Sequence, residues 1–187
     1  MTTPRSLAKA DRRSALLDAA ASLFAERGFT RVSLEDLGTA VGVSGPAVYR
    51  HFEGKQAVLA ALLVGVSEGL VVGGTEVVDA TTDAAEALRS LIAFHVRFAL
   101  ANADVIRVQD RDLGSLAPED EHTVRALQRA YVELWVGVLA RLHPDTDPAT
   151  LRVRAHATFG LINSTPHSGR TRGTGEILEQ MARSALA

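Results

Sequence analysis

Apolar residues along this chain recur with the spacing of α-helices from one end to the other. Residues 12–27 and 83–101 each place an apolar stripe on one helical face. Similar patterns predict helices from residue 55, over 104–113, 118–143 and 148–163, and over 177–185. No stretch alternates apolar and polar residues for long enough to predict a strand. We therefore predict an all-α fold of about nine helices.

Two short helices are predicted between residues 33 and 52, on either side of a tight turn. Ser33 heads the first helix, with Asp36 three residues later as in a capping box, and Gly42 ends it. Ser44 caps the second helix, which starts at Gly45-Pro46, where proline is tolerated in the first turn. Two helices this short cannot bury a core alone, so the preceding helix is predicted to complete a three-helix helix-turn-helix domain.

The second short helix carries polar side chains on its outer face. A helix of this size fits the major groove of DNA. Ser44 leaves backbone N–H groups free at the helix start, where they favour a phosphate oxygen, and Lys55 reaches the same DNA strand. The outward side chains are predicted to be Ala47, Tyr49, Arg50 and His51.

Charge divides the chain at the end of this region. The net charge is −2 over 187 residues. Residues 1–55 carry eight Lys or Arg against six Asp or Glu, whereas residues 56–187 carry twelve against sixteen. A mildly basic head on an acidic body is typical of a protein that touches phosphate with one end only. We place a domain boundary between residues 55 and 56.

Composition and motif content exclude several classes of function. The chain has no cysteine and residues 56–187 have no lysine, which excludes thiol nucleophiles, thiolate metal sites and Schiff-base chemistry there. Glu119-x-x-His122 has the spacing of one of the two Glu-x-x-His motifs of a di-iron site, but the sequence has no second such motif. We expect no enzymatic activity, no cofactor and no metal.

The longest apolar run, 57–66, is too short to span a bilayer, and the N-terminus lacks a secretory signal. We expect a cytoplasmic protein with no membrane partner.

Three segments of the chain resemble the helix-turn-helix of the tetracycline-repressor-like (TetR) family. They are Gly28-Phe29-Thr30, Gly42-Val43-Ser44 and Tyr49-Arg50-His51-Phe52, followed by Lys55. The resemblance covers residues 12–60 and implies a homodimer that binds double-stranded DNA through residues 1–55. By position in the motif, the implied phosphate contacts are Ser33, Ser44, Tyr49, His51 and Lys55.

The tip of the predicted recognition helix departs from the family pattern. Gly45, Pro46 and Ala47 stand where many relatives have a longer polar residue and then glycine, and their side chains have no hydrogen-bond donor. Base reading then falls to Arg50, Arg31 and contact of Ala47 with a thymine methyl, or to DNA shape. The predicted DNA-binding residues are Arg31, Ser33, Ser44, Gly45, Pro46, Ala47, Tyr49, Arg50, His51 and Lys55.

The helices predicted over 118–143 and 148–163 occupy the place where the family forms a four-helix dimer interface. Each carries one apolar stripe, and two such stripes suffice for a two-fold, self-complementary interface. An ordinary core within one chain would give the same pattern. The predicted interface residues are Leu127, Tyr131, Leu134, Val138, Leu151, Ala155, Phe159 and Ile162.

The resemblance also implies that residues 56–187 form a helical domain that binds a small-molecule inducer. His95 lies in an apolar stripe, where a histidine is either a ligand contact or a core residue with its hydrogen bonds satisfied. The segments FHVRFAL, RVQDRDL and FGLINSTPHSGR look similar to regulators of lipophilic or acyl-CoA-linked metabolism, which favours such an inducer. The predicted ligand-binding residues are Phe94, His95, Phe98, Gln109, Trp135, His156, Phe159 and Asn163.

These features predict a transcriptional repressor that a small ligand releases from an inverted-repeat operator. The alternative is a ligand-binding or interaction protein of the same fold that does not bind DNA specifically, and the Gly45-Pro46-Ala47 tip keeps this alternative open.

The helix after Lys55 carries Gly65, Gly69 and Gly73 on one face, followed by Gly74. We interpret this face in one of two ways. It is either a close contact with a neighbouring helix, with the helix ending at Gly73-Gly74, or a weak segment through which ligand binding moves the DNA-binding domain.

Overall fold

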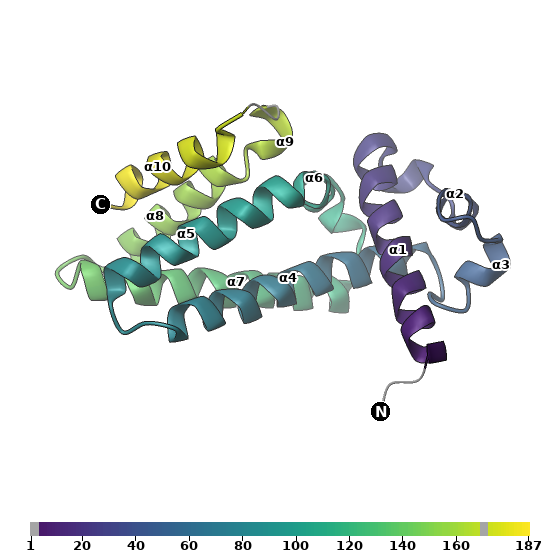
Figure 1. Ribbon diagram of the computed structural model, residues 1–187, viewed down its shortest axis with the longest axis horizontal. Helices are drawn as coiled ribbons and strands as arrows, with labels where there is room; N and C mark the ends of the chain where they lie inside the picture. Colours follow the sequence, from purple (N-terminus) through teal and green to yellow (C-terminus); the bar gives the residue numbers. More distant parts are fainter. Residues whose placement is uncertain (1–3, 169–171) are drawn as a thin grey trace.

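The protein is an elongated assembly of helices with a small domain, here called the head, at one end (Figure 1). The computed structural model describes residues 4–168 and 172–187. No strand occurs among these residues, so the predicted all-α fold is confirmed, and each predicted helix is present. A further short helix, α9 (Thr165–Ser168), follows the helix predicted over 148–163.

Three helices form the head: α1 (Pro4–Arg27), α2 (Leu34–Ala40) and α3 (Gly45–Val48). The Ser33 hydroxyl accepts a hydrogen bond from the Asp36 backbone N–H at 3.1 Å, and the Asp36 carboxylate accepts one from the Ser33 N–H at 2.8 Å. The predicted capping box at the start of α2 is therefore confirmed. Gly42, with a φ of 69°, turns the chain from α2 toward α3.

A close contact between α2 and α3 fixes the direction in which α3 points. A Cβ at Gly38 would lie 2.8 Å from the Val43 carbonyl oxygen and 3.1 Å from Val48 Cγ2, so only glycine fits there. The apolar side chains beneath α2 and α3 form one core with α1, and its buried members include Leu16, Phe24, Leu37, Val48 and Phe52. The outer surface of α3 is thereby turned away from the rest of the molecule.

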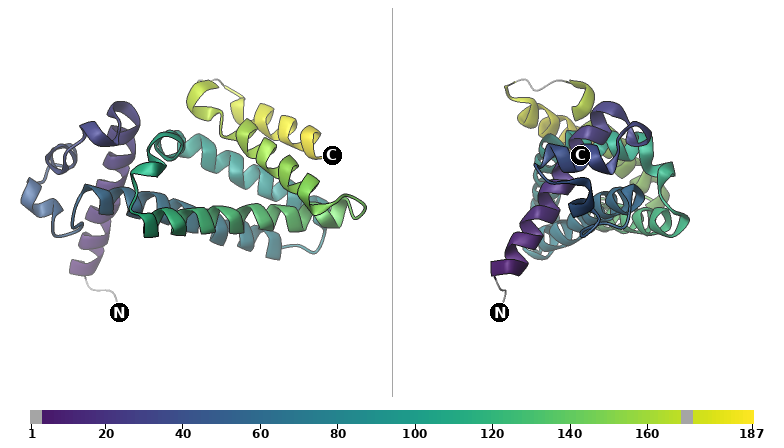
Figure 2. Two further views of the ribbon diagram at one scale, coloured as in Figure 1. Left: turned by 180° about the vertical axis from the view of Figure 1, so that it is seen from behind. Right: turned by 90° about the vertical axis from the view of Figure 1, so that its right-hand side faces the viewer.

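The long helix α4 (Lys55–Asp79) joins the head to the larger domain and contributes to both cores. Residues 58–63 pack with the head, and residues from Leu70 onward pack with the larger domain. By length and composition α4 is apolar enough to cross a membrane, but it lies against α5 and α7 as a core helix (Figure 2). It continues through Gly73-Gly74 to Asp79, so the predicted end at the two glycines is wrong.

Packing explains why α4 does not end at its glycines. A Cβ at Gly73 would lie 2.6 Å from the Phe94 ring of α5, and a Cβ at Gly74 would lie 2.7 Å from the Tyr131 ring of α7. Packing against these two rings therefore holds α4 helical where its intrinsic helix propensity is poor. A Cβ at Gly65 or Gly69 would have no atom within 4 Å. The expectation of one continuous close-packed glycine face is therefore wrong for Gly65 and Gly69.

The larger domain stacks its helices along α4 (Figures 1 and 2). Its further long helices are α5 (Ala84–Ala101), α6 (Ala103–Asp112), α7 (Pro118–Leu142), α8 (Pro148–Ile162) and α10 (Thr174–Leu186). α4 and α7 run side by side, while α5, α8 and α10 form a second layer over them. Trp135 of α7 is fully buried in the core between these layers.

Helix α6 joins the larger domain to the head a second time. Arg111 donates hydrogen bonds to the carbonyl oxygens of Phe24 and Ala25, which lie near the C-terminal end of α1, where a cation is favoured. Asp112, which is 8% exposed, accepts from the same guanidinium at 2.8 Å. The contact with α1 therefore orders both side chains, although Arg111 stays exposed.

Candidate DNA-binding surface and ligand cavity

The outer surface of the head presents the two side chains with the strongest predicted DNA contacts. Tyr49 is 61% exposed and Arg50 is also exposed, immediately after the single helical turn of α3. Backbone hydrogen bonds from Arg50 to Ala47 and from Phe52 to Val48 continue that turn, which anchors both side chains to the head core. The two side chains therefore project from a rigid base.

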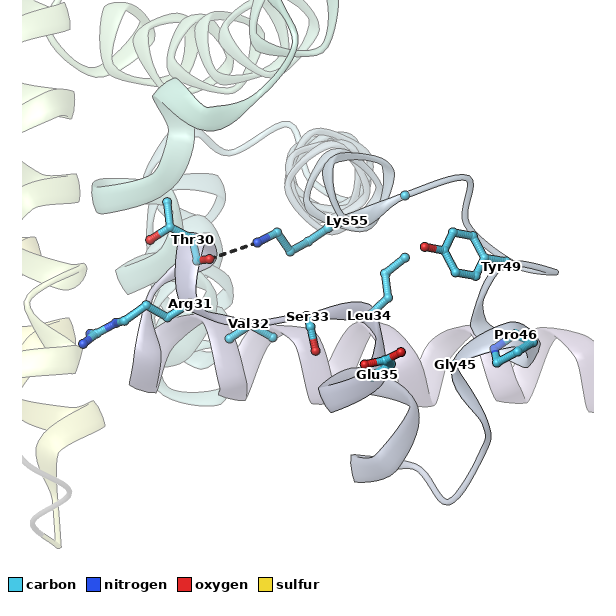
Figure 3. Close-up of a pocket in the computed structure, with 11 residues that line it drawn as sticks. Thr30, Arg31, Val32, Ser33, Leu34, Glu35, Gly45, Pro46, Tyr49 and Lys55 are labelled. Carbon is cyan, nitrogen blue, oxygen red and sulfur yellow. Dashed lines mark hydrogen bonds between the residues drawn. The ribbon is translucent and has the colours of Figure 1, made fainter.

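A hollow of about 580 Å³ lies beside α3, between the start of α2 and the start of α4 (Figure 3). It brings together six of the residues predicted to bind DNA, namely Arg31, Ser33, Gly45, Pro46, Tyr49 and Lys55. The remaining four, Ser44, Ala47, Arg50 and His51, do not line it. The Tyr49 hydroxyl and the Lys55 ammonium line the hollow and suit a phosphate oxygen, whereas the Glu35 carboxylate also lines it and the Arg31 side chain points away from Tyr49 (Figure 3).

Lys55 has a role in the fold that the sequence did not indicate. Its ammonium donates hydrogen bonds to the carbonyl oxygens of Phe29 at 2.8 Å and Thr30 at 3.2 Å (Figure 3). The same ammonium lies 4.5 Å from the centre of the Phe29 ring, as in a cation–π contact. Two of its three N–H donors are thus committed to the segment between α1 and α2, and one is left for a phosphate.

The two predicted phosphate-binding serines differ in what their hydroxyls do. The Ser33 hydroxyl donates to the Asp36 carboxylate at 2.6 Å and accepts from the Asp36 backbone, so it serves the capping box. These hydrogen bonds hold the pKa of Asp36 below its usual value. The exposed Ser44 side chain makes no capping hydrogen bond to α3. Ser44 is therefore the better placed of the two hydroxyls to accept an outside partner.

His51 is held only partly outward. It is half-buried, and its Nδ1 atom is buried with no hydrogen-bond partner in the described part of the chain. Burial is the main cause that lowers the pKa of His51, and four positive charges nearby lower it further, namely those of Lys9, Arg12, Arg13 and Arg50. His51 therefore contributes a neutral ring at neutral pH, in a neighbourhood that is itself positively charged.

The larger domain encloses a cavity of about 240 Å³ among α4, α5, α6, α7 and α8. His95 lines it and is 3% exposed, with Nε2 3.1 Å from Asn163 Oδ1 and Nδ1 3.2 Å from the Tyr131 hydroxyl. Since an amide oxygen only accepts, Nε2–H donates to Asn163, and the Tyr131 hydroxyl donates to Nδ1. The cavity is lined by Ser67, Leu70, His95, Gln109, Leu127, Gln128, Tyr131, Val132, His156, Phe159 and Asn163.

The polar cluster in this cavity is uncharged. Burial lowers the pKa of His95 to about 4, against which the hydrogen bond to Asn163 acts only weakly. Burial also raises the pKa of Tyr131 well above its usual value. The rings of His95, Tyr131 and Phe159 lie within 5.0 to 5.6 Å of one another, centre to centre. The cavity therefore offers polar, neutral groups and aromatic faces to a ligand.

Five of the eight predicted ligand-binding residues line this cavity: His95, Gln109, His156, Phe159 and Asn163. Phe94 and Phe98 lie instead beside Gly69 in a separate surface groove between α4 and α5. Trp135 is fully buried behind the cavity, packed 5.0 Å from the Phe159 ring centre, with its Nε1 unpaired among the described residues. None of these three side chains lines the cavity, so their ligand contacts stay predictions without support from it.

Sequence reasoning missed part of the cavity wall. Ser67 and Leu70 were not predicted, although they lie three residues apart on one face of α4, and neither were Gln128 and Val132 of α7. Leu127 and Tyr131 line the cavity too, although their stripe was assigned to the dimer interface. The buried Ser67 hydroxyl donates to the Leu63 carbonyl at 2.7 Å, so a serine in this apolar stretch did not by itself indicate a cavity.

The predicted dimer-interface stripes face the inside of the protomer. Tyr131, Val138, Leu151, Ala155 and Ile162 are at most 5% exposed, and Leu127, Leu134 and Phe159 are half-buried. The five buried side chains pack within the protomer, because α7 turns its stripe toward α4 and α5 and α8 turns its stripe toward α10, whereas the interface role of Leu127, Leu134 and Phe159 stays a prediction. The exposed residues of α7 and α8 include five small or apolar ones, namely Gly137, Ala140, Val153, Ala157 and Gly160, beside charged ones such as Arg129 and Glu133.

The architecture defines a helix-turn-helix protein with a separate helical effector domain. Family models match both parts: bacterial regulatory proteins of the tetR family over residues 16–62, and the tetracyclin repressor-like C-terminal domain over residues 81–186. The chain belongs to the TetR family of bacterial regulatory proteins. The resemblance predicted from the head motif is therefore confirmed.

Individual relatives agree with this membership. The chain is 30% identical to the HTH-type transcriptional repressor KstR2 of Rhodococcus jostii over 132 residues, which is 70% of this chain and 65%, just under two thirds, of that relative. The TetR-family regulator PfmR of Thermus thermophilus has a TM-score of 0.80, 26% identity, and coverage of 91% and 96% of the two chains. A TetR-family regulator of Bordetella parapertussis has the same fold, with a TM-score of 0.82, 21% identity and coverage of 93% and 91%.

Proposed function

We propose that this protein is a homodimeric, cytoplasmic transcriptional repressor that binds an inverted-repeat DNA operator and leaves it when a small ligand enters the cavity around His95. The observation that carries the DNA part is the hollow beside α3, which Tyr49 and Lys55 line next to exposed Arg50. The name of the R. jostii relative, a transcriptional repressor, supports the direction of regulation.

In this proposal the head divides its contacts between DNA backbone and bases. Tyr49 and Lys55 contact phosphates, which sets affinity and its salt dependence but carries no sequence information. Arg50 reaches a base edge, for which guanine is the usual partner of arginine. The side chains of Gly45, Pro46 and Ala47 add shape and apolar contact rather than hydrogen bonds.

A second copy of the chain binds against the outer faces of α7 and α8. Gly137 and Ala140 on α7, and Val153, Ala157 and Gly160 on α8, form a surface on which helices from a partner approach closely. Val153 is 67% exposed in the single chain, which is unusual for so apolar a side chain. The family implies a dimer interface of four helices, two from each chain. In this protein the exposed small residues of α7 and α8 support such an interface, rather than the buried apolar stripes of the same helices.

Ligand and DNA are coupled through α6. Gln109 lines the cavity, and two residues later Arg111 holds the end of α1 through the Phe24 and Ala25 carbonyls. A ligand that moves α6 therefore moves the head as well. Such coupling is typically about 1–3 kcal/mol and reciprocal, so DNA weakens ligand binding by the factor by which the ligand weakens DNA binding.

A gel-shift titration on the DNA upstream of the protein's own gene tests the DNA part. We expect a specific complex whose affinity falls steeply with salt, because phosphate contacts release counterions. Arg50→Ala should reduce discrimination at one base position by about 1–3 kcal/mol, and Tyr49→Phe should weaken all sequences alike. Binding that is equally weak on every sequence for the wild type would instead favour a ligand-binding or interaction protein of the same fold.

A further inference from the structure

The hollow beside α3 contains one acidic side chain, which sequence reasoning did not predict as a DNA contact. Glu35 is the second residue of α2, is exposed, and is the only acid among the residues that line this hollow. It lies between Ser33 and the start of α3 (Figure 3). Phosphates repel a carboxylate, so Glu35 lowers the affinity of this surface for any DNA unless it meets a hydrogen-bond donor there.

The two acids in the first turn of α2 differ in what their carboxylates do. The Asp36 carboxylate accepts hydrogen bonds from the Ser33 N–H at 2.8 Å and the Ser33 hydroxyl at 2.6 Å. The Glu35 carboxylate makes no hydrogen bond or ion pair within residues 4–168 and 172–187. An acid in the first turn favours the start of a helix, but Asp36 already supplies that charge together with two hydrogen bonds. The Glu35 carboxylate is therefore free to accept from an outside donor.

Gly45, the first residue of α3, leaves the space that Glu35 occupies. A Cβ at Gly45 would lie 3.1 Å from Glu35 Cγ and 3.9 Å from Glu35 Oε1. The backbone does not require glycine there, because the glycines with positive φ are Gly28, Gly42 and Gly173. The missing side chain instead lets the Glu35 stem lie against the tip of α3.

The chemistry of the base edges selects the partner of a carboxylate in this place. Gly45, Pro46 and Ala47 give the tip of α3 no polar side chain, and a carboxylate from α2 lies beside that tip. Ionised carboxylates only accept hydrogen bonds. In the major groove cytosine presents an amino donor and no acceptor, adenine presents its amino group beside the N7 acceptor, and guanine and thymine present no donor. Cytosine is therefore the base that suits Glu35 best.

We propose that Glu35 reads a cytosine in each half-site of the operator, from α2 and through the space left by Gly45. This assignment deepens the proposed function and rests on it, because it takes the hollow beside α3 as a DNA-binding surface. It moves one base contact from the recognition helix to the helix before it. It also makes sequences without that cytosine poorer binders, since the unpaired carboxylate then repels the DNA.

Selection from a library of randomised duplex DNA, followed by sequencing, tests the assignment. We expect the wild type to retain one cytosine in each half-site and Glu35→Ala to reduce that preference at least about fivefold, the lower end of what one good base contact provides. Glu35→Gln should shift the preference toward adenine, because an amide both donates and accepts. The matched control is Glu26→Gln, which removes an equal charge from an exposed position of α1 outside the hollow and should leave every base preference unchanged.

A change at Gly45 tests whether the space on α3 positions the carboxylate. In Gly45→Leu the new side chain takes the place of the Glu35 stem, so the cytosine preference should fall about as far as in Glu35→Ala. Because both changes then act through one contact, the double variant should lose no more than either single variant. Full cytosine preference in Gly45→Leu would overturn the part that Gly45 has in this assignment.

The outcomes separate this inference from the proposed function. Selection of no sequence by the wild type would mean that specific DNA binding itself fails. A wild-type motif that Glu35→Ala and Glu35→Gln leave unchanged at every position would overturn the cytosine contact and leave specific DNA binding intact. Lower thermal stability of both variants with unchanged base preference would assign Glu35 to the start of α2 alone.

Discussion

The two tyrosines of the chain lie in opposite surroundings, and the contrast describes the two regions of the molecule. In the head, Tyr49 is 61% exposed, and its hydroxyl borders an open hollow beside α3. In the larger domain, Tyr131 is 5% exposed, and its hydroxyl donates to His95 inside a cavity. The head turns its polar groups outward, whereas the larger domain buries its own, which in the proposed function suits DNA for the first and a small ligand for the second.

This difference also determines how each region is held together. The core of the head is built from apolar side chains, so the polar residues on its surface do not contribute to that core. In the larger domain the His95 cluster is part of the core, so the same groups serve stability and binding. Changes at the proposed ligand site are therefore expected to alter stability, and changes on the outer surface of the head are expected to do so only where a side chain also bonds to the fold, as Lys55 and Ser33 do.

The largest expected effect concerns the outer faces of α7 and α8. Ala157→Arg should produce monomers, because it buries an unpaired charge where the second copy binds. DNA affinity should fall about 100-fold or more, since one head then binds without the other. Sedimentation and gel shift measure both effects. Gln180→Arg, at an exposed position of α10, is the matched control, and dimers of Ala157→Arg would show that the interface lies elsewhere.

The next prediction concerns the buried His95. Its pKa of about 4 lies below the unfolded value near 6.5, so the unfolded state binds more protons at acidic pH. Stability is full above pH 6.5 and is lost as pH falls toward 4, by about 3 kcal/mol in all. Urea unfolding at pH 7 and pH 4.5 should show a smaller loss for His95→Gln than for the wild type. The exposed His122→Gln should keep the wild-type loss, and an equal loss in all three would contradict the assignment.

The third prediction concerns two glycines of α4 whose replacement by alanine should change the stability of the protein in opposite directions. Gly74→Ala places a Cβ 2.7 Å from the Tyr131 ring and 2.9 Å from Leu134, and should destabilise the protein by about 1–3 kcal/mol. Gly69→Ala meets no atom within 4 Å and should stabilise it by about 0.5–1 kcal/mol through helix propensity. Thermal unfolding compares the two variants. Stabilisation by both would mean that α7 moves aside more easily than the packing indicates.

The head could be predicted from sequence more completely than the larger domain for a physical reason. Short-range signals such as the Ser33–Asp36 capping box and the turn at Gly42 act within a few residues, so the sequence shows them directly. An apolar stripe, by contrast, shows that a helix face is covered but not by what. Tyr131 and Leu151 were therefore assigned to a second chain, although α4, α5 and α10 of the same chain cover them.

The smallest expected effect tests whether one side chain in the head serves fold and DNA together. The Lys55 ammonium donates to the Phe29 and Thr30 carbonyls and has one N–H left for a phosphate. Lys55→Met keeps the apolar stem and should lower the free energy of unfolding by about 1 kcal/mol, because two carbonyls lose a donor. It should also reduce the slope of log affinity against log salt by about one, equally for operator and unrelated DNA. Tyr49→Phe is the control, since it removes a hydroxyl from the same hollow without a charge and should leave the salt slope intact. A Lys55→Met protein with lower stability but an unchanged salt slope would show that this lysine only supports the fold, and that the phosphate contacts of the head come from Arg31 and Arg50 instead.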